Sequence, residues 1–187
     1  MGDYNQTIVD PDATAEDAEA LAERVVAWLI AEEIVLAERT YHMYDKPVYT
    51  PGPRWSQVTN ERHLLASDGL AVVTGRTVFF GALGSDGSPI CPRCTEVIAT
   101  ERWTRSEGVL GPFPSAMDTW HKTGAAEVRC PACGHPAPLP EWAWEHNCFA
   151  FAYLGFEFWN GPRLRSEFIS ELGRVLGHRT RVVEGKI

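Results

Sequence analysis

Four cysteines stand in two short pairs that could share one metal ion. The pairs are Cys91-Pro-Arg-Cys94 and Cys130-Pro-Ala-Cys133, both of the C-P-x-C type. Each pair places two thiolates on one tight turn, and two such turns together form a closed shell of four sulfurs, which is typical of structural zinc. Four cysteine ligands leave no open position for a catalytic water, so we expect the metal to stabilise the fold and not to catalyse a reaction.

The cysteine segment resembles zinc ribbons, and its second knuckle, with Pro131 and Gly134, also resembles the second knuckle of rubredoxins. The first resemblance implies a zinc site with four cysteine ligands, and the second implies iron and electron transfer as an alternative. Rubredoxins usually carry a glycine after the first pair as well, where this chain has Thr95. Zinc is therefore preferred over iron as the expected metal. As a whole the chain resembles small bacterial proteins, without pointing to a particular family.

Other reactive side chains give weaker signals for chemistry. Cys148 with His146 or His121 could form a nucleophile and its base. However, Cys148 opens an apolar strand pattern, where a free cysteine usually behaves as a small buried hydrophobe. His135 and Cys148 are also spare donors near the second knuckle, and we expect both to serve packing or hydrogen bonding.

Two polar-aromatic clusters are candidates for a binding surface or a pocket. They are Asp118, Trp120 and His121 between the knuckles, and Tyr41, His42 and Tyr44 after the first expected helix. Packing is the alternative role for both: on the zinc knuckles for the first cluster and at the edge of the core for the second. A β-hairpin containing Trp103 and Trp120 is expected between the two knuckles.

Length and composition fit one globular domain. The chain has 187 residues, of which 44% are hydrophobic and 22% are charged, which is enough for one substantial core. It lacks an apolar run of membrane-spanning length, and its first residues lack the basic and apolar segments of a secretory signal. We therefore expect a soluble, cytoplasmic protein. In such a reducing compartment, paired cysteines are metal ligands more often than disulfides.

The charge distribution argues against nucleic acid as a partner. The net charge is −8, whereas affinity for nucleic acid comes from Lys and Arg that neutralise phosphates. Basic residues do gather in the last part of the sequence, at Arg163, Arg165, Arg174, Arg179, Arg181 and Lys186. Glu167 and Glu171 lie along the same helical rows, so we expect local ion pairs there and no phosphate-binding stripe.

The elements that position these residues begin with a helix. Residues 2–12 are polar and are expected to be frayed. Asp12 or Thr14 can cap a helix whose pattern continues, kinked or restarted near Glu32, to about Arg39. Pro and Gly then interrupt the pattern over residues 45–60. This segment is predicted to be a long loop that carries Tyr49 and Trp55.

Strand patterns dominate the rest of the chain. Residues 70–80 fit either a hairpin or a single bulged strand around Thr74-Gly75, and residues 148–159 are a strong strand candidate. A helix over residues 163–176 and a strand over 180–183 would complete a β-α-β unit with two parallel strands. The expected class is α+β: an N-terminal helix and a small mixed sheet that ends in this unit.

The expected organisation is a core made of residues 1–88 and 140–187, with a zinc-ribbon-like insert over residues 89–139. The favoured function is a non-catalytic module that engages another protein. Three alternatives remain: an enzyme with a pocket between the sheet and the N-terminal helix, rubredoxin-like electron transfer, and nucleic-acid binding through the basic tail. A deep pocket with convergent polar groups would favour the enzyme, and an exposed apolar patch would favour the interaction module.

Overall fold

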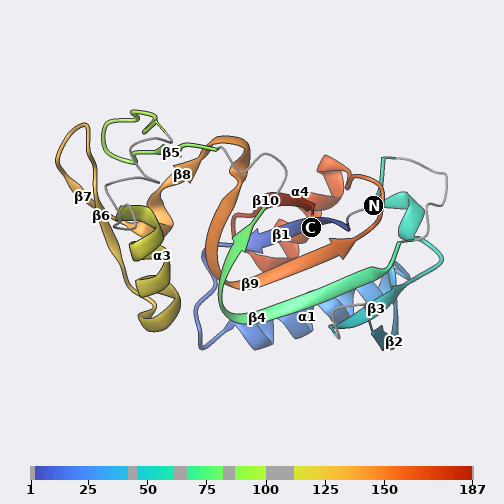
Figure 1. The fold of residues 1–187 in the computed structure, drawn as a ribbon. Coiled ribbons are helices and arrows are strands. Elements are labelled where there is room, and N and C mark those ends of the chain that lie inside the picture. Colours follow the sequence, from blue (N-terminus) through green and yellow to red (C-terminus); the bar gives the residue numbers. More distant parts are fainter. Residues whose placement is uncertain (1–2, 42–45, 61–66, 82–86, 100–111, 187) are drawn as a thin grey trace.

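The computed structural model describes residues 3–41, 46–60, 67–81, 87–99 and 112–186. They form a six-stranded sheet that carries two helices, with a smaller lobe at one end (Figure 1). The α+β class is confirmed. The strands lie in the order β10-β1-β9-β4-β3-β2. Their bounds are β1 (Tyr4–Asp10), β2 (Val35–Tyr41), β3 (Pro47–Pro51), β4 (Gly69–Phe80), β9 (Phe149–Trp159) and β10 (Arg181–Lys186).

Two helices, α1 (Ala18–Ala31) and α4 (Ser166–Leu176), pack together on one face of the sheet. Trp28 of α1 and Phe168 of α4 stack with ring centroids 6.0 Å apart. Beneath them lie the apolar side chains that β9 turns to this face, including Leu154, Phe156 and Phe158. This layer is the main hydrophobic core, and the burial of its apolar area does most to hold the helices on the sheet.

The first strand corrects the expectation that residues 2–12 are frayed. β1 lies inside the sheet, antiparallel to β9 on one side and to β10 on the other, and its Ile8 and Val9 are fully buried. Asn5, Gln6 and Thr7 give the segment its polar character, yet these side chains are buried as well. Asn5 and Thr7 line a cavity on one face of the sheet, whereas Gln6, on the other face, bonds with Glu184 and with Leu164 N–H.

The expected continuation of the first helix to Arg39 is also wrong. A reciprocal pair of hydrogen bonds precedes α1: Thr14 N–H donates to Asp17 Oδ1 at 2.7 Å, and Asp17 N–H donates to Thr14 Oγ1 at 3.3 Å. The helix ends at Ala31, and Glu33 has the left-handed φ of 55° that reverses the chain. The residues beyond it form β2, because pairing with β3 satisfies their backbone groups.

Residues 45–60 were expected to form a long loop, but part of this segment is β3, which lies between β2 and β4. Tyr49 on β3 and Trp55 on the short 3-10 helix Trp55–Gln57 are both buried. β3 begins and ends with proline, a residue that is rare inside sheets, and for this reason its sequence does not indicate a strand. Pairing with β2 and β4 therefore determines the extended conformation of β3, and its local composition does not.

The two longest strands follow the expectations more closely. β4 is a single strand whose pairing with β9 shifts between Thr74 and Thr77, so the bulged alternative is confirmed over the hairpin. β9, α4 and β10 form the expected β-α-β unit, since β9 and β10 both run antiparallel to β1 and are therefore parallel to each other. β1 separates them, and the described ladders of this sheet are all antiparallel, whereas a mixed sheet was expected.

The sheet bends strongly along β4 and β9 (Figure 1). A Cβ atom placed on Gly81, directly after β4, would collide with the carbonyl oxygen of Glu184 on β10. The end of β4 thus reaches the far edge strand, so this end of the sheet is partly closed into a barrel. Gly155 on β9 also favours the bend. It has no side chain, and the ring of Phe79 on β4 occupies the space that a Cβ atom would need there.

The smaller lobe contains both cysteine pairs. Its described elements are β5 (Pro89–Ile90), α3 (Pro112–Thr123), β6 (Glu127–Arg129), β7 (Pro136–Pro138) and β8 (Ala143–Trp144). The strands form two small antiparallel pairs, β5 with β8 and β6 with β7. Their buried side chains make a second hydrophobic cluster, which reaches the main sheet at Cys148 and Phe151. No helix in the described part of the chain is long and apolar enough to cross a membrane.

Candidate metal centre

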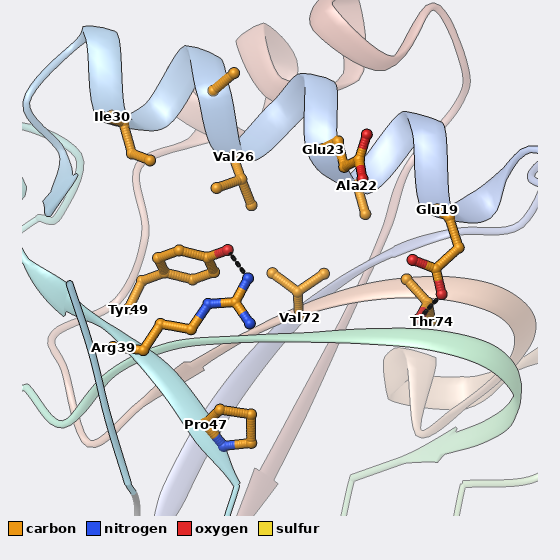
Figure 2. A pocket seen from close by; sticks show the side chains of 11 residues that line it. Glu19, Ala22, Glu23, Val26, Ile30, Arg39, Pro47, Tyr49, Val72 and Thr74 are labelled. Atoms are coloured by element: carbon orange, nitrogen blue, oxygen red, sulfur yellow. Dashed lines mark hydrogen bonds between the residues drawn. The ribbon is translucent and has the colours of Figure 1, made fainter. Parts of the chain in front are cut away.

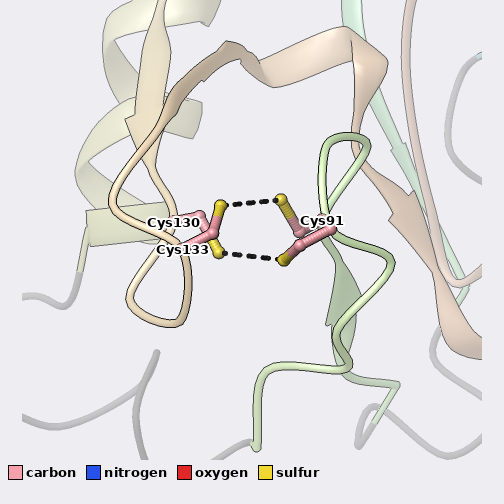
Figure 3. A group of neighbouring side chains, drawn as sticks. Cys91, Cys130 and Cys133 are labelled. Carbon is pink, nitrogen blue, oxygen red and sulfur yellow. Dashed lines mark hydrogen bonds between the residues drawn. The ribbon is translucent and has the colours of Figure 1, made fainter.

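The four paired cysteines come together in the smaller lobe (Figure 3). Cys91 Sγ lies 3.9 Å from Cys133 Sγ, Cys94 Sγ lies 3.9 Å from Cys130 Sγ, and all four sulfurs lie within 4.8 Å of one another. A tetrahedral ion with metal–sulfur bonds of about 2.3 Å would separate its sulfur ligands by about 3.8 Å. The cluster therefore has the size that a four-thiolate metal site requires.

The two knuckles have the same backbone construction. In the first, Thr95 N–H donates to Cys91 O at 3.0 Å and Arg93 N–H points at Cys91 Sγ at 3.4 Å. In the second, Gly134 N–H donates to Cys130 O at 2.9 Å and Ala132 N–H points at Cys130 Sγ at 3.4 Å. Each leading sulfur thus receives a backbone N–H bond that stabilises a thiolate.

The residue after each pair adopts the left-handed conformation. Gly134 has φ 73° and Thr95 has φ 61°, so threonine takes at the first knuckle the conformation that glycine takes at the second. Thr95 thus differs from Gly134 in residue type but not in backbone shape. Its hydroxyl donates to Cys94 O at 2.6 Å, which offsets part of the strain of a β-branched residue in this region.

Burial and charge distinguish the four sulfurs. Cys91 and Cys130 are buried, Cys94 is exposed and Cys133 is intermediate. Burial opposes ionisation of Cys91, but the N–H groups of Cys94 and Arg93 and the neighbouring thiols stabilise its thiolate, and its pKa falls to about 7. Cys91 can therefore be a thiolate, the form that binds a metal ion, near neutral pH.

An aromatic core supports the knuckles from one side. Phe113 of α3 makes edge contacts with Trp142 and Trp144, with ring centroids 4.8 and 5.3 Å apart, and Phe113 and Trp142 are fully buried. Trp142 Nε1 donates to Ala137 O on β7, at 3.4 Å. Because β6 and β7 flank the second pair, this packing fixes where Cys130 and Cys133 stand.

The remaining donors do not join the cluster. His135 is exposed, and its carbonyl oxygen accepts a hydrogen bond from Cys130 N–H at 2.9 Å. Cys148 is 4% exposed, its Sγ points at Gly87 O at 3.7 Å, and burial raises its pKa to about 11. A neutral, buried thiol is a poor nucleophile, so the structure supports the packing role of Cys148 and not a dyad with His146 or His121.

Trp120 of the aromatic cluster between the knuckles is buried, which favours the packing role over the binding surface. Trp120 lies on α3 and not in a hairpin, is 2% exposed and packs edge-on against Phe151 at 5.6 Å. Asp118 pairs with Lys122 one turn later, at 2.7 Å. An amphipathic helix explains this pattern, because only one of its faces packs on the sheet. Trp103 lies outside the described residues.

A cavity of about 370 Å³ lies between α1 and the sheet, where the enzyme alternative places one (Figure 2). Its apolar wall includes Val26 and Val72, while two of its polar groups already have partners. Arg39 donates to the hydroxyl of Tyr49 and lies 4.4 Å over its ring, while Glu19 accepts from Thr74 Oγ1 at 3.0 Å.

The second aromatic cluster is only partly described. Tyr41 is 78% exposed and does not line the α1 cavity, whereas His42 and Tyr44 lie outside the described residues.

Four of the basic residues near the end of the sequence form ion pairs, of which the pairs with Glu167 and Glu171 are the local ones that helical spacing predicts, whereas Glu184 and Asp12 lie far along the chain. The pairs are Arg163–Glu184, Arg165–Glu167, Arg174–Glu171 and Arg179–Asp12, at 2.9, 3.7, 3.5 and 2.5 Å. Burial and the nearby guanidinium of Arg179 lower the pKa of Arg181. The side chain of Lys186 is not described.

One polar site was missed altogether. Glu157 is 7% exposed within the apolar run of β9, where it pairs with Lys46 at 2.9 Å. A single carboxylate among Phe156, Phe158 and Trp159 was the available signal, because an acid in a buried strand needs a partner.

Comparison of the chain with models of known families, with curated proteins and with solved structures found no match.

Proposed function

We propose that Cys91, Cys94, Cys130 and Cys133 bind one Zn²⁺ ion, and that this ion holds the smaller lobe of a non-catalytic protein-interaction module. The observation that supports the metal is the approach of four sulfurs to within 4.8 Å of one another on two matching knuckles. Four thiolates brought this close repel one another unless a cation balances their charge. Four thiolates also complete a tetrahedral shell, so the ion would act on structure and not on a substrate.

The interaction role rests on how the lobe presents apolar groups. Val97, on the segment after the first knuckle, is 45% exposed although the neighbouring Ile98 is buried. Ile90 and Val97 form an isolated antiparallel bridge, which holds this segment against β5. A rigid, exposed apolar side chain suits contact with another protein, because little conformational freedom is lost when it is covered.

Elemental analysis of protein purified without chelator tests the metal. We expect one zinc per chain, because the four sulfurs match the size of one tetrahedral shell. Cys130→Ser should lose the ion, whereas Cys148→Ser, which removes the one cysteine outside the cluster, should keep it. A metal content near zero would contradict the proposal. Iron, with the red colour of a four-thiolate iron site, would instead establish the rubredoxin-like alternative.

The interaction role has its own test. Affinity capture from the native host should retain a protein partner with the wild-type chain and with Thr123→Ala, and lose it with Val97→Lys. Capture that Val97→Lys leaves unchanged would remove Val97 from the contact surface.

A further inference from the structure

The sheet face opposite α1 and α4 contains a second cavity, of about 270 Å³. It lies where β4 and β9 bend, between the inner strands and the end of β4. Its lining includes Asn5, Thr7, Lys46, Glu157, Trp159 and Phe80. Mouths of curved and barrel-like sheets are frequent places for small-molecule sites.

A buried carboxylate lies at the centre of this lining. Glu157 Oε2 accepts two hydrogen bonds, one from Lys46 Nζ at 2.9 Å and one from Trp159 Nε1 at 3.1 Å. The other oxygen, Oε1, makes no hydrogen bond with any residue that the structure describes. Apolar residues in place of a buried ion pair often give equal or greater stability. Fold stability alone therefore does not account for Glu157.

Two further buried polar side chains stand beside Glu157. Thr7 pairs with Glu157 across the β1–β9 ladder, and Asn5 pairs with Trp159 one step along. The two residues are 3% and 8% exposed, respectively. Within the described ranges, neither the hydroxyl of Thr7 nor the side-chain amide of Asn5 makes a hydrogen bond. Neither group is among the fully buried atoms that lack a partner, so both face the open space of the cavity, where a bound molecule can supply their hydrogen bonds.

The charges define what that molecule can be. Lys46 and Glu157 neutralise each other, so the cavity favours an uncharged ligand. The free groups include an acceptor, Glu157 Oε1, and groups that both donate and accept, on Thr7 and Asn5. Phe80, 57% exposed, supplies an apolar wall. Trp159 is 1% exposed, so its ring face is not available for a flat base to stack on.

We propose that this cavity binds an uncharged, polyhydroxylated ring of monosaccharide size. Such a ring carries alternating donors and acceptors on its edge and C–H groups on its faces, which matches the polar centre and the apolar wall. The volume of about 270 Å³ is just under the range of roughly 300–1,000 Å³ typical of drug-sized ligands, so a single ring fits best. This site lies outside the cysteine cluster and does not depend on its metal.

Saturation-transfer NMR with the full chain tests the proposal, using D-glucose, D-galactose and D-ribose as probes and adenosine for comparison. We expect transfer to at least one sugar, and a loss of affinity of about tenfold in Thr7→Val, which removes one hydroxyl and keeps the side-chain shape. Thr74→Val is the matched control, because it makes the same change at the α1 cavity, and it should leave sugar binding unchanged.

Thermal unfolding without ligand separates a binding role of Thr7 from a structural one. If Thr7 serves a ligand, Thr7→Val removes a hydroxyl that has no partner among the described residues and should not lower the Tm. If the hydroxyl supports the fold, the Tm should fall, and the proposal would be overturned. It would also be overturned if none of the sugars received saturation, if transfer persisted unchanged in Thr7→Val, or if adenosine alone bound.

Discussion

Thr95 and Gly134 show how one residue position shapes a metal knuckle. Both lie directly after a cysteine pair and both adopt positive φ, 61° and 73°. Glycine enters this region without steric cost, whereas a side chain costs roughly 1–2 kcal/mol there. The two knuckles therefore have the same shape but different strain.

This difference in strain predicts that two substitutions change the stability of the metal-loaded protein to different extents. Gly134→Ala should destabilise it by about 1 kcal/mol, because a Cβ there meets no atom within 4 Å and only the backbone conformation is strained. Thr95→Gly should not destabilise it, since relief of strain offsets the greater flexibility of the unfolded chain. Urea unfolding measures both. Equal loss of stability in the two variants would show that the hydroxyl bond from Thr95 to Cys94 O outweighs backbone strain.

Cys148 should resist thiol reagents in the folded protein, because burial raises its pKa to about 11 and keeps the thiol neutral. We expect iodoacetamide at pH 8 to leave Cys148 unlabelled by mass spectrometry until denaturant is added. Since folding raises this pKa, the associated stability is complete below about pH 8.5 and is lost as the pH rises toward the folded value. Rapid labelling of Cys148 at pH 8 would contradict its buried placement.

At the scale of elements, the sequence was most informative where structure is local. The cysteine knuckles, α1 before Ala31 and α4 depend on residues close in sequence, and β9 has a long β-type run of its own, so their patterns predicted them. β1 and β3 depend on partners far along the chain, and their composition predicts irregular segments instead. Asn5, Gln6 and the prolines of β3 do not favour a strand locally, although the β-branched run Thr7-Ile8-Val9 was an available strand signal in β1.

The two candidate sites differ in the same way in how far the sequence predicts them. The C-P-x-C spacing predicted each knuckle as a local turn, and the need of a tetrahedral metal for four ligands predicted that the two knuckles meet. The sugar-sized cavity could not be predicted, since Thr7, Lys46 and Glu157 meet only through the register of β1 with β9 and the path of the chain into β3. The apolar run around Glu157 gave the one local indication.

Metal loss should affect the two halves of β4 and β9 differently. Phe151 belongs to the cluster of the smaller lobe, whereas Leu154, Phe156 and Phe158 belong to the main core. Hydrogen exchange of Cys130→Ser should therefore show lost protection in β5–β8, in α3 and at the start of β9. Protection should remain in β1, in α4 and in the rest of β9. Cys148→Ser is the control for loss of a thiol, and uniform loss of protection would show that the lobe and the sheet form one cooperative unit.

At the scale of the whole molecule, paired charges oppose nucleic-acid binding. Arg163, Arg165, Arg174 and Arg179 each have a carboxylate partner, and the net charge is −8. A carboxylate partner offsets the positive charge of each of these four residues, which weakens the release of counterions from phosphates on which nucleic-acid affinity depends. We expect no binding to mixed-sequence duplex DNA or single-stranded RNA in fluorescence anisotropy at physiological salt. Micromolar binding that weakens steeply with added salt would refute this expectation.

The position of β1 also determines the order in which the fold can be assembled during translation. Of the strands in this sheet, β1 is synthesised before all the others, yet its partners β9 and β10 begin at Phe149 and Arg181. At about 5–20 residues per second, the ribosome needs roughly 7–30 s to supply the first of them. An apolar strand left unpaired for that time would be prone to aggregate. Asn5 and Thr7, which line the cavity in the folded protein, make this strand less apolar, so we expect them to lower its tendency to aggregate while the sheet is incomplete.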